Sequence, residues 1–263
     1  MPTIQQVYEA LNEKAPFSFQ MDFDNAGFLV GRGGQTVTSI LVSLDITEAV
    51  IAEAVEQGAQ LIVSHHPVIF FPAKHITDQD PTGRKLLAMT ENHIGAICAH
   101  TSLDAVQDGV NDQLAKALGL SQIGQLHEDG TDFNGGAYGI GRVGEVEPCT
   151  LAAFAERVKE ALSTRGVRVA DAGKNVHRVA VGGGSCGSML NDVLAKGCDT
   201  FVTADVKYDT FLDAVAQGIN LIDAGHFSTE NVVCPMMVDY LKACFPDVKV
   251  CQSKVHREVF SIL

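Results

Sequence analysis

The stretch EAVEQGAQLIVSHHP, residues Glu53–Pro67, predicts how this chain folds. A helical pattern ends at Gly58, where glycine adopts the positive φ of a helix C-terminus at little cost. The apolar run Leu61–Ser64 follows and has the length and composition of a buried strand. Two histidines, His65 and His66, come next, and the proline after them ends the strand because it has no N–H to donate. Together these features are typical of an α/β fold.

The same unit recurs along the sequence. Asp192–Thr203 reads DVLAKGCDTFVT and carries Gly197 in register with Gly58, Ala214–Ala224 reads AVAQGINLIDA, and Glu91–Ala99, ENHIGAICA, is a looser copy. Each copy is followed by polar residues, which are His65 with His66, His100 with Asp104, Asp205, and His226 with Glu230. Because α/β sheets bind ligands beyond the carboxyl ends of their strands, we expect these side chains at such an edge.

Hydrophobic periodicity predicts alternating strands and helices with a largely parallel sheet pattern. We expect strands at Ser39–Leu44, Leu61–Ser64, Gly95–Ala99, Ala137–Val146, Val176–Val181, Thr200–Thr203, Asn220–Asp223 and Glu258–Ile262. We expect helices at Glu48–Glu56, Gly83–Asn92, Asn111–Leu118, Leu151–Leu162, Met189–Lys196, Tyr208–Gln217 and Asn231–Ala243. The likeness of Ser39–His66 to Arg178–Asp205 predicts two related α/β halves, residues 1–125 and 126–263, with the C-terminal strand free to return to the first half.

Composition narrows the class of protein. The chain has 263 residues and a net charge of −13, which disfavours a nucleic-acid partner and is compatible with binding cations. The N-terminal residues resemble an amphipathic helix rather than a signal peptide, and no apolar run has membrane-spanning length, so we expect a cytoplasmic protein without membrane contact. Seven scattered cysteines without a C-x-x-C pair predict buried, reduced thiols rather than disulfides or a cysteine zinc site.

The polar residues after the strands make a set of metal-ligand type. His226 and Glu230 are four residues apart and share one face if a helix begins there. With His65, His66 and Asp104 they supply three imidazoles and two carboxylates, which suit zinc, manganese or iron. The set exceeds what one four-coordinate ion needs, so we expect two divalent ions bridged by a carboxylate and a hydroxide.

Structural roles are the alternative for each of these residues. Asp104 alone would serve as a helix cap and Glu230 alone as a first-turn acid, but their repeated placement after strands favours metal binding. For the other histidines we expect structural roles; they are His75, His93, His127, His177 and His256.

Glycine-rich segments offer a rival interpretation. VGGGSCG, Val181–Gly187, has dinucleotide-fingerprint spacing, with Asp205 near the place of a ribose-binding acid, but it is an internal element. GIGRVG, Gly139–Gly144, does not lead directly into a helix, so close backbone packing explains it better. Alternatively, Arg142, Lys207 and the amides of Gly182–Gly187 could hold the phosphates of a substrate.

Several motifs together resemble one known family. They are DNAGFLVG (Asp24–Gly31), SLDIT (Ser43–Thr47), LIVSHHPVIF, AHTSLD with GVND, GIGRVG, VTADVKYD and LIDAGHFSTE. In this order they resemble the GTP cyclohydrolase type 2 homologues, also called Nif-three-like dinuclear metal-centre proteins. The resemblance implies two α/β halves that face each other across a dinuclear metal site and a toroidal homohexamer. It implies metal ligands at His65, His66, Asp104, His226 and Glu230, with Glu230 the bridge and Glu230 and Asp104 the catalytic carboxylates.

The resemblance also implies an activity. We expect a metal-dependent hydrolase that uses a bridging hydroxide to attack GTP or a related nucleotide, opening the guanine imidazole ring and releasing formate. A phosphoesterase is equally compatible with two bridged ions. A non-catalytic metal-binding assembly or regulatory protein is a further alternative, because a fold and a metal site do not fix a reaction.

Overall fold

The computed structural model describes residues 1–132 and 135–262, a mixed α/β chain that packs as two units. The first unit comprises Met1–Leu103 and Cys234–Arg257. The second comprises Asp104–Val233 together with the C-terminal residues from Glu258. The expected domain boundary at residue 125 stays a prediction; the packing units differ from it, because the segment after Asp104 packs in the second unit and Cys234–Arg257 returns to the first.

The first unit contains a five-stranded sheet in the order β1-β4-β3-β2-β13. Its strands are β1 Gly27–Val30, β2 Ser39–Ser43, β3 Leu61–Ser64, β4 Gly95–Cys98 and β13 Lys249–Gln252. β13, β2, β3 and β4 run parallel to one another, and β1 is antiparallel to β4. The carboxyl ends of β2, β3 and β4 therefore lie at the same edge of the sheet.

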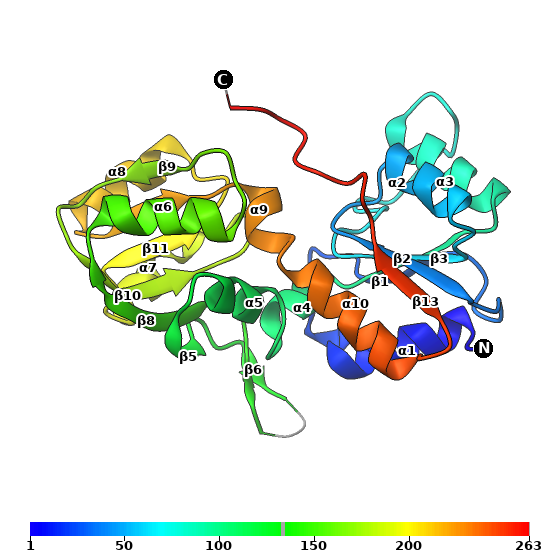
Figure 1. Cartoon of the computed structure of the whole chain (residues 1–263), viewed down its shortest axis with the longest axis horizontal. Coiled ribbons are helices and arrows are strands. Elements are labelled where there is room, and N and C mark those ends of the chain that lie inside the picture. The colour runs from blue at the N-terminus through cyan, green and yellow to red at the C-terminus, as the bar shows by residue number, and fades with distance from the viewer. Residues whose placement is uncertain (133–134, 263) are drawn as a thin grey trace. The chain divides into compact units, whose positions relative to one another are not determined.

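Helices cover both faces of this sheet (Figure 1). On one face α2 Glu48–Glu56 and α3 Pro81–Glu91 pack against the strands in a core cluster that includes Leu41, Val50, Ile62, Leu86 and Met89. On the other face lie α1 Ile4–Lys14 and α10 Val233–Cys244, which the Tyr240 hydroxyl links by donating to the Ala10 carbonyl at 2.6 Å. A short 3₁₀ turn, Phe17–Phe19, follows α1, and the short helix α4, Thr101–Ala105, follows β4.

The second unit contains a six-stranded sheet in the order β5-β8-β10-β11-β12-β9. Its strands are β5 Ser121–Gln125, β8 Arg142–Cys149, β9 Arg168–Ala170, β10 Val176–Val181, β11 Thr200–Thr203 and β12 Asn220–Asp223. β10, β11 and β12 are parallel, and the others pair antiparallel. The residues that follow β10, β11 and β12 thus emerge at one edge.

Helices again pack on both faces of this second sheet (Figure 1). One core cluster joins α5 Val110–Ala117 and α6 Leu151–Ala161 to the strands through Leu114, Phe154, Val158, Val179 and Val202. Another joins α7 Leu190–Ala195 and α8 Tyr208–Ala216 to the opposite face through Leu190, Val193, Phe201, Ala214 and Leu221. The remaining elements are β6 Gly130–Thr131, β7 Ala137–Tyr138, the 3₁₀ turn Gly187–Met189 and α9 His226–Glu230.

The repeated helix–glycine–strand unit is confirmed. Gly58, Gly197 and Gly218 have φ values of +64°, +67° and +75° and end α2, α7 and α8 just before β3, β11 and β12. In the looser copy His93 takes the left-handed position, with φ of 56°. The glycine at each stop therefore lets the chain turn from a helix directly into a buried strand.

Two strand predictions are wrong. Glu258–Ile262 forms no strand; the C-terminal strand is β13, Lys249–Gln252, which pairs with β2 in the first unit. The expected strand Ala137–Val146 is divided into β7 and β8, because Gly139 and Gly141 between them adopt positive φ. Within the described residues, no helix combines the length and apolarity required to cross a lipid bilayer.

Candidate metal centre

Three histidines of the first unit gather at the carboxyl edge of its sheet. His65 and His66 follow β3 directly, and His100 follows β4. One ring nitrogen of each lies within 4.8 Å of one ring nitrogen of the others. The two adjacent imidazoles converge because the strand ends at Ser64, whose hydroxyl donates to the His66 carbonyl at 2.8 Å and closes a turn. Without that turn, neighbouring residues of a strand would point to opposite faces.

Each of these rings is oriented through its Nδ1. The acceptors, all 2.8 Å away, are the Ala99 carbonyl for His65, Oδ1 of Asp45 for His66 and Oδ1 of Asp24 for His100. A carbonyl or an ionised carboxylate only accepts, so Nδ1 carries the proton and Nε2 carries the lone pair. Metal-binding histidines are typically held in this way by a carboxylate or carbonyl behind them.

Both orienting carboxylates are held in their charged form. Burial disfavours the charge on Asp24, but hydrogen bonds from His100 and Thr101 outweigh it and lower its pKa to about 2. Burial likewise opposes ionisation of Asp45, and hydrogen bonds from His256 and His66 hold its pKa well below the usual range. The two carboxylates therefore remain acceptors for the Nδ1 protons at neutral pH.

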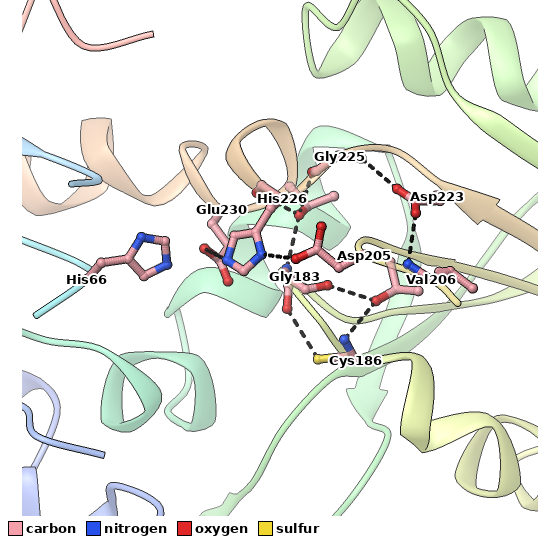
Figure 2. A network of polar contacts seen from close by, with 12 residues as sticks. His66, Gly183, Cys186, Asp205, Val206, Asp223, Gly225, His226 and Glu230 are labelled. Carbon is pink, nitrogen blue, oxygen red and sulfur yellow. Dashed lines mark hydrogen bonds and ion pairs between the residues drawn. The ribbon is translucent and has the colours of Figure 1, made fainter. Parts of the chain in front are cut away.

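The second unit holds a histidine and a glutamate side by side. Nδ1 of His226 lies 2.7 Å from Oδ2 of Asp205, and its Nε2 lies 3.0 Å from Oε2 of Glu230 (Figure 2). With the Nδ1 proton on the Asp205 side, a neutral His226 turns its Nε2 lone pair toward the Glu230 carboxylate. Two facing lone pairs repel, so this pair calls for a cation, either a second proton or a metal ion. Two ligands about 2.1 Å from one ion lie about 3 Å apart at a right angle, so the distance suits a metal.

The turns that present this pair are fixed by Asp223 at the end of β12. Its carboxylate accepts from the Val206 amide at 2.9 Å and the Gly225 amide at 3.1 Å (Figure 2). Both turns have unusual backbone: φ is +52° at Asp205 and +85° at Gly225. One buried carboxylate thereby ties the turn that carries Asp205 to the turn that begins α9.

The glycine-rich loop after β10 encloses Glu230. A Cβ at Gly184, where φ is +64°, would overlap Oε1 of Glu230 and come within 3.2 Å of the His226 ring. A Cβ at Gly183 would lie 3.3 Å from the Glu230 side chain and 2.9 Å from Val110. Close approach of the backbone to the glutamate therefore explains these glycines.

The first three glycine amides of this loop are already bound within the protein. The Gly182 amide donates to the Val202 carbonyl at 2.9 Å, the Gly183 amide to the Asn111 side chain at 2.9 Å and the Gly184 amide to the Thr229 hydroxyl at 3.0 Å. Asp205, the expected ribose acid of that alternative, binds His226 instead. The dinucleotide interpretation of this loop is wrong, and so is its use as a phosphate cradle through these amides.

Asp104 is another buried carboxylate of this unit, with 8% of its surface exposed. Its backbone carbonyl accepts from the Asn111 side chain at 2.9 Å. Burial raises the pKa of the Cys186 thiol well above its usual range, and the negative charges of Asp104 and Glu230 add to this. One carboxylate oxygen of Asp104 lies within 4.8 Å of one of Glu230, so the two acids are close together in the second unit.

Arg142 does not hold a substrate phosphate, contrary to expectation. It is buried, pairs with Asp112 at 2.8 Å and donates to the carbonyls of Gly139, Gly141, Ala105 and Val106. A guanidinium whose donors are so engaged stabilises the loop that follows Asp104. The GIGRVG motif is a packing element, as expected: a Cβ at Gly141 would clash with Leu126 and the Val181 carbonyl. Lys207 is exposed at the start of α8.

The predicted ligands thus fall into two groups. His65 and His66 lie together in the first unit, whereas Asp104, His226 and Glu230 belong to the second. His100 was expected after a strand but not as a ligand, and the orienting roles of Asp24, Asp45 and Asp205 were not expected from the sequence. These three acids lie in the motifs DNAG, SLDIT and VTADV, respectively. Their presence in motifs shared with the family was the one sequence signal that could have indicated a role at the site.

Comparison with known proteins shows which family this chain matches. Residues 2–258 match the family described as Duf34/NIF3 (NGG1p interacting factor 3). A Clostridium acetobutylicum relative named GTP cyclohydrolase 1 type 2 homolog is 35% identical over 229 residues, 86% of this chain and 85% of its own length. A Clostridium perfringens relative of the same name is 32% identical and covers 99% of both chains.

The fold is also found among solved structures. A Bacillus cereus protein described as related to NIF3 superimposes with a TM-score of 0.94 at 25% sequence identity. The alignment covers 100% of this chain and 99% of the other. The expected fold class, a mixed α/β structure with two sheet-containing halves, is confirmed by this match.

Proposed function

Because the chain belongs to the Duf34/NIF3 family, we propose that it is a dinuclear metal-dependent hydrolase acting on GTP or a related nucleotide. The single observation that carries the proposal is the common orientation of four histidines. His65, His66, His100 and His226 each have Nδ1 bound to a carbonyl or carboxylate, which leaves Nε2 as the metal-binding nitrogen.

The ligands proposed for the two ions are the five residues that the family resemblance implies, with one addition. They are His65, His66, Asp104, His226 and Glu230, and the ring-nitrogen proximity of His100 adds it to the set. Imidazole nitrogens and carboxylate oxygens suit zinc, iron or manganese, and the sequence of the site does not select among them. When bound, two such ions lower the pKa of a water molecule toward neutrality and stabilise negative charge that develops on the substrate.

The chain's own residues have distinct parts in this proposal. Glu230 is the bridging ligand, and Glu230 and Asp104 are the catalytic carboxylates. Asp24, Asp45 and Asp205 hold the imidazoles in the tautomer that a metal requires. Gly184 keeps the backbone close to Glu230 and so limits the positions its carboxylate can take.

Metal content is the first test. Elemental analysis of the purified protein should give close to two ions per chain. His66→Ala in the first unit and Glu230→Ala in the second should both reduce that number sharply, because the proposal needs ligands from each unit. Asp239→Ala, on α10 and outside the proposed ligand set, serves as the control and should retain the metal. Full metal content in both ligand variants would exclude the proposed centre.

The reaction is tested with protein of known metal content. Incubation with GTP should release formate, because one water opens the guanine imidazole ring at C8 to a formamide and a second water hydrolyses that formamide. Release of phosphate or a mononucleotide from GTP or from phosphodiesters would instead identify a phosphoesterase, for which the same pair of ions is suited. Intact metal without turnover across a broad panel of nucleotides and phosphoesters would favour a metal-binding assembly or regulatory protein.

We also propose a cytoplasmic homohexamer, on the strength of the family resemblance. Seven free cysteines, of which Cys98, Cys198 and Cys234 are buried, suit a reducing compartment. Light scattering coupled to size-exclusion chromatography should give about six times the mass of the chain, which is 28.0 kDa. A monomeric mass would contradict the proposed hexamer and would leave the proposed metal site unaffected.

A further inference from the structure

A pocket lies beside the histidine cluster within the first unit. It has a volume of about 460 Å³ and is formed by the segment that follows β3 and by the start of α3. Pro67, the residue after His66, lines it, and so does Phe70. The Phe70 ring also packs edge-on against His100, with 6.2 Å between the ring centroids. The pocket and the histidine cluster therefore share a wall.

The pocket presents aromatic surface. Phe71 is 77% exposed, and its ring meets that of Phe70 at 83° with centroids 4.8 Å apart. Exposing so much apolar surface to water is unfavourable in free energy, and a bound group that covers the ring would remove this cost. Because most of the Phe71 side chain is exposed, it offers ring surface for a flat ring to stack upon.

The pocket also concentrates positive charge in a chain whose net charge is −13. Lys74, His75 and Lys85 line it. In the described part of the chain neither lysine forms an ion pair, whereas Lys116, Lys159 and Lys196 each pair with a carboxylate. The one acid of the lining, Asp80, caps α3 by accepting from the Gly83 amide at 2.8 Å, so its charge is directed at the helix N-terminus.

Lys85 is the more deeply placed of the two ammonium groups. It lies on α3, half-buried, and burial lowers its pKa, while the charges of Asp45 and Glu48 act in the opposite direction. Asp45 is the carboxylate that orients His66. A bound anion would compensate the burial of this ammonium on the pocket side.

From this placement we infer that the pocket is a binding subsite for an aromatic ring that bears an anionic group, a purine nucleotide in chemical class. The ring stacks on Phe71, and the anion lies between Lys74 and Lys85. The inference rests on the proposed function for the choice of a nucleotide and extends it, since it assigns a place for the substrate next to His66 and His100.

Equilibrium binding tests it on the protein as purified, with the metal content of each sample measured. The probes are GMP, guanosine and inorganic phosphate, which offer the ring with the anion, the ring alone and the anion alone. We expect GMP to bind most tightly. Phosphate binding as tightly as GMP would overturn the role of the ring, and guanosine binding as tightly as GMP would overturn the role of the lysines.

Three variants locate the site. Phe71→Ala should weaken both GMP and guanosine about tenfold, the scale of one stacking contact. Lys74→Ala combined with Lys85→Met should weaken GMP about tenfold or more and leave guanosine unchanged. Lys159→Ala removes a lysine on α6 outside the pocket and should leave all three affinities as they are. Unchanged GMP affinity in both pocket variants would overturn the assignment.

The outcomes separate this subsite from the proposed function. GMP binding that depends on Phe71 and the lysines, in protein that releases no formate from GTP, would retain the subsite and reject the reaction. Formate release that all pocket variants sustain with unchanged KM would retain the reaction and reject the subsite.

Discussion

Nε2 of His226 faces Oε2 of Glu230 at 3.0 Å while the other nitrogen of the same ring is held by Asp205 at 2.7 Å. One imidazole is thus placed between two carboxylates, with its tautomer set by the exposed one. The Glu230 carboxylate is buried and faces the other ring nitrogen, so a cation shared by the two, either a second proton or a metal ion, would stabilise its charge.

Removing the charge of Asp205 should therefore weaken metal binding without removing a ligand. We expect Asp205→Asn to lower metal affinity about 10- to 100-fold, the usual effect of losing an orienting carboxylate. Competition with a chelator of known affinity measures it. Asp209→Asn, an exposed change on α8, is the matched control and should leave the affinity unchanged.

Gly184 should be needed for space as well as for backbone conformation. Gly184→Ala and Gly197→Ala both place a Cβ at positive φ, +64° and +67°, but no atom lies within 4 Å of a Cβ at Gly197. Both changes should cost about 1–2 kcal/mol for the left-handed backbone. Only Gly184→Ala should also displace Glu230 and release metal. Chemical denaturation with elemental analysis separates the two effects, and equal metal content in the two variants would contradict the spatial role.

His256 was expected to be structural, and its contacts extend that expectation to the candidate centre. Its Nε2 lies 3.0 Å from Oδ2 of Asp45, whose other oxygen holds His66 at 2.8 Å. The segment before it is anchored to α2, since Ser253 and Lys254 donate to Glu53. Asp45, which positions the proposed ligand His66, is thus itself held by His256 in the C-terminal segment.

His256→Ala should consequently loosen Asp45 and with it the ring of His66. We expect a several-fold fall in metal affinity. His177→Ala provides the control, because His177 also bonds a backbone carbonyl through Nδ1 but touches no proposed ligand. Competition with a chelator of known affinity measures the metal affinity of both variants. The same affinity in the two would show that Asp45 needs no support from His256.

Features of the fold and the site that depend on neighbouring residues were predictable from sequence, whereas contacts between residues far apart in the sequence were not. The helix–glycine–strand units and the residues after them were accessible because hydrophobic periodicity and glycine stops are local signals. His65 and His66 were predicted from one strand and its proline. The orienting carboxylates were not, since Asp24 and His100 are 76 positions apart in the sequence and leave no local trace of their 2.8 Å contact.

Edge strands were the weakest prediction for a related reason. Glu258–Ile262 has the alternation of a strand, but the place beside β2 is taken by Lys249–Gln252, whose Val250 is buried there. Pattern alone does not say which of two neighbouring segments pairs with the sheet. Arg142 was misassigned likewise, because its partner Asp112 and two of the carbonyls it binds, those of Ala105 and Val106, come from distant segments.

The burial of that arginine gives the final prediction, which concerns stability. Arg142 and Asp112 have side-chain exposures of 4% and 11%, and the guanidinium ties the backbone after Asp104 to β8. Removing one member leaves the other charge buried, so Arg142→Met should cost about 3–5 kcal/mol of unfolding free energy. Arg142→Met with Asp112→Asn should cost less, because no unpaired charge remains. Urea denaturation of these two variants and of Asp112→Asn alone, beside the exposed pair change Lys159→Ala, measures the difference. A double variant as unstable as the sum of its single changes would mean that the packing and carbonyl contacts of Arg142, rather than its charge pairing, stabilise the loop.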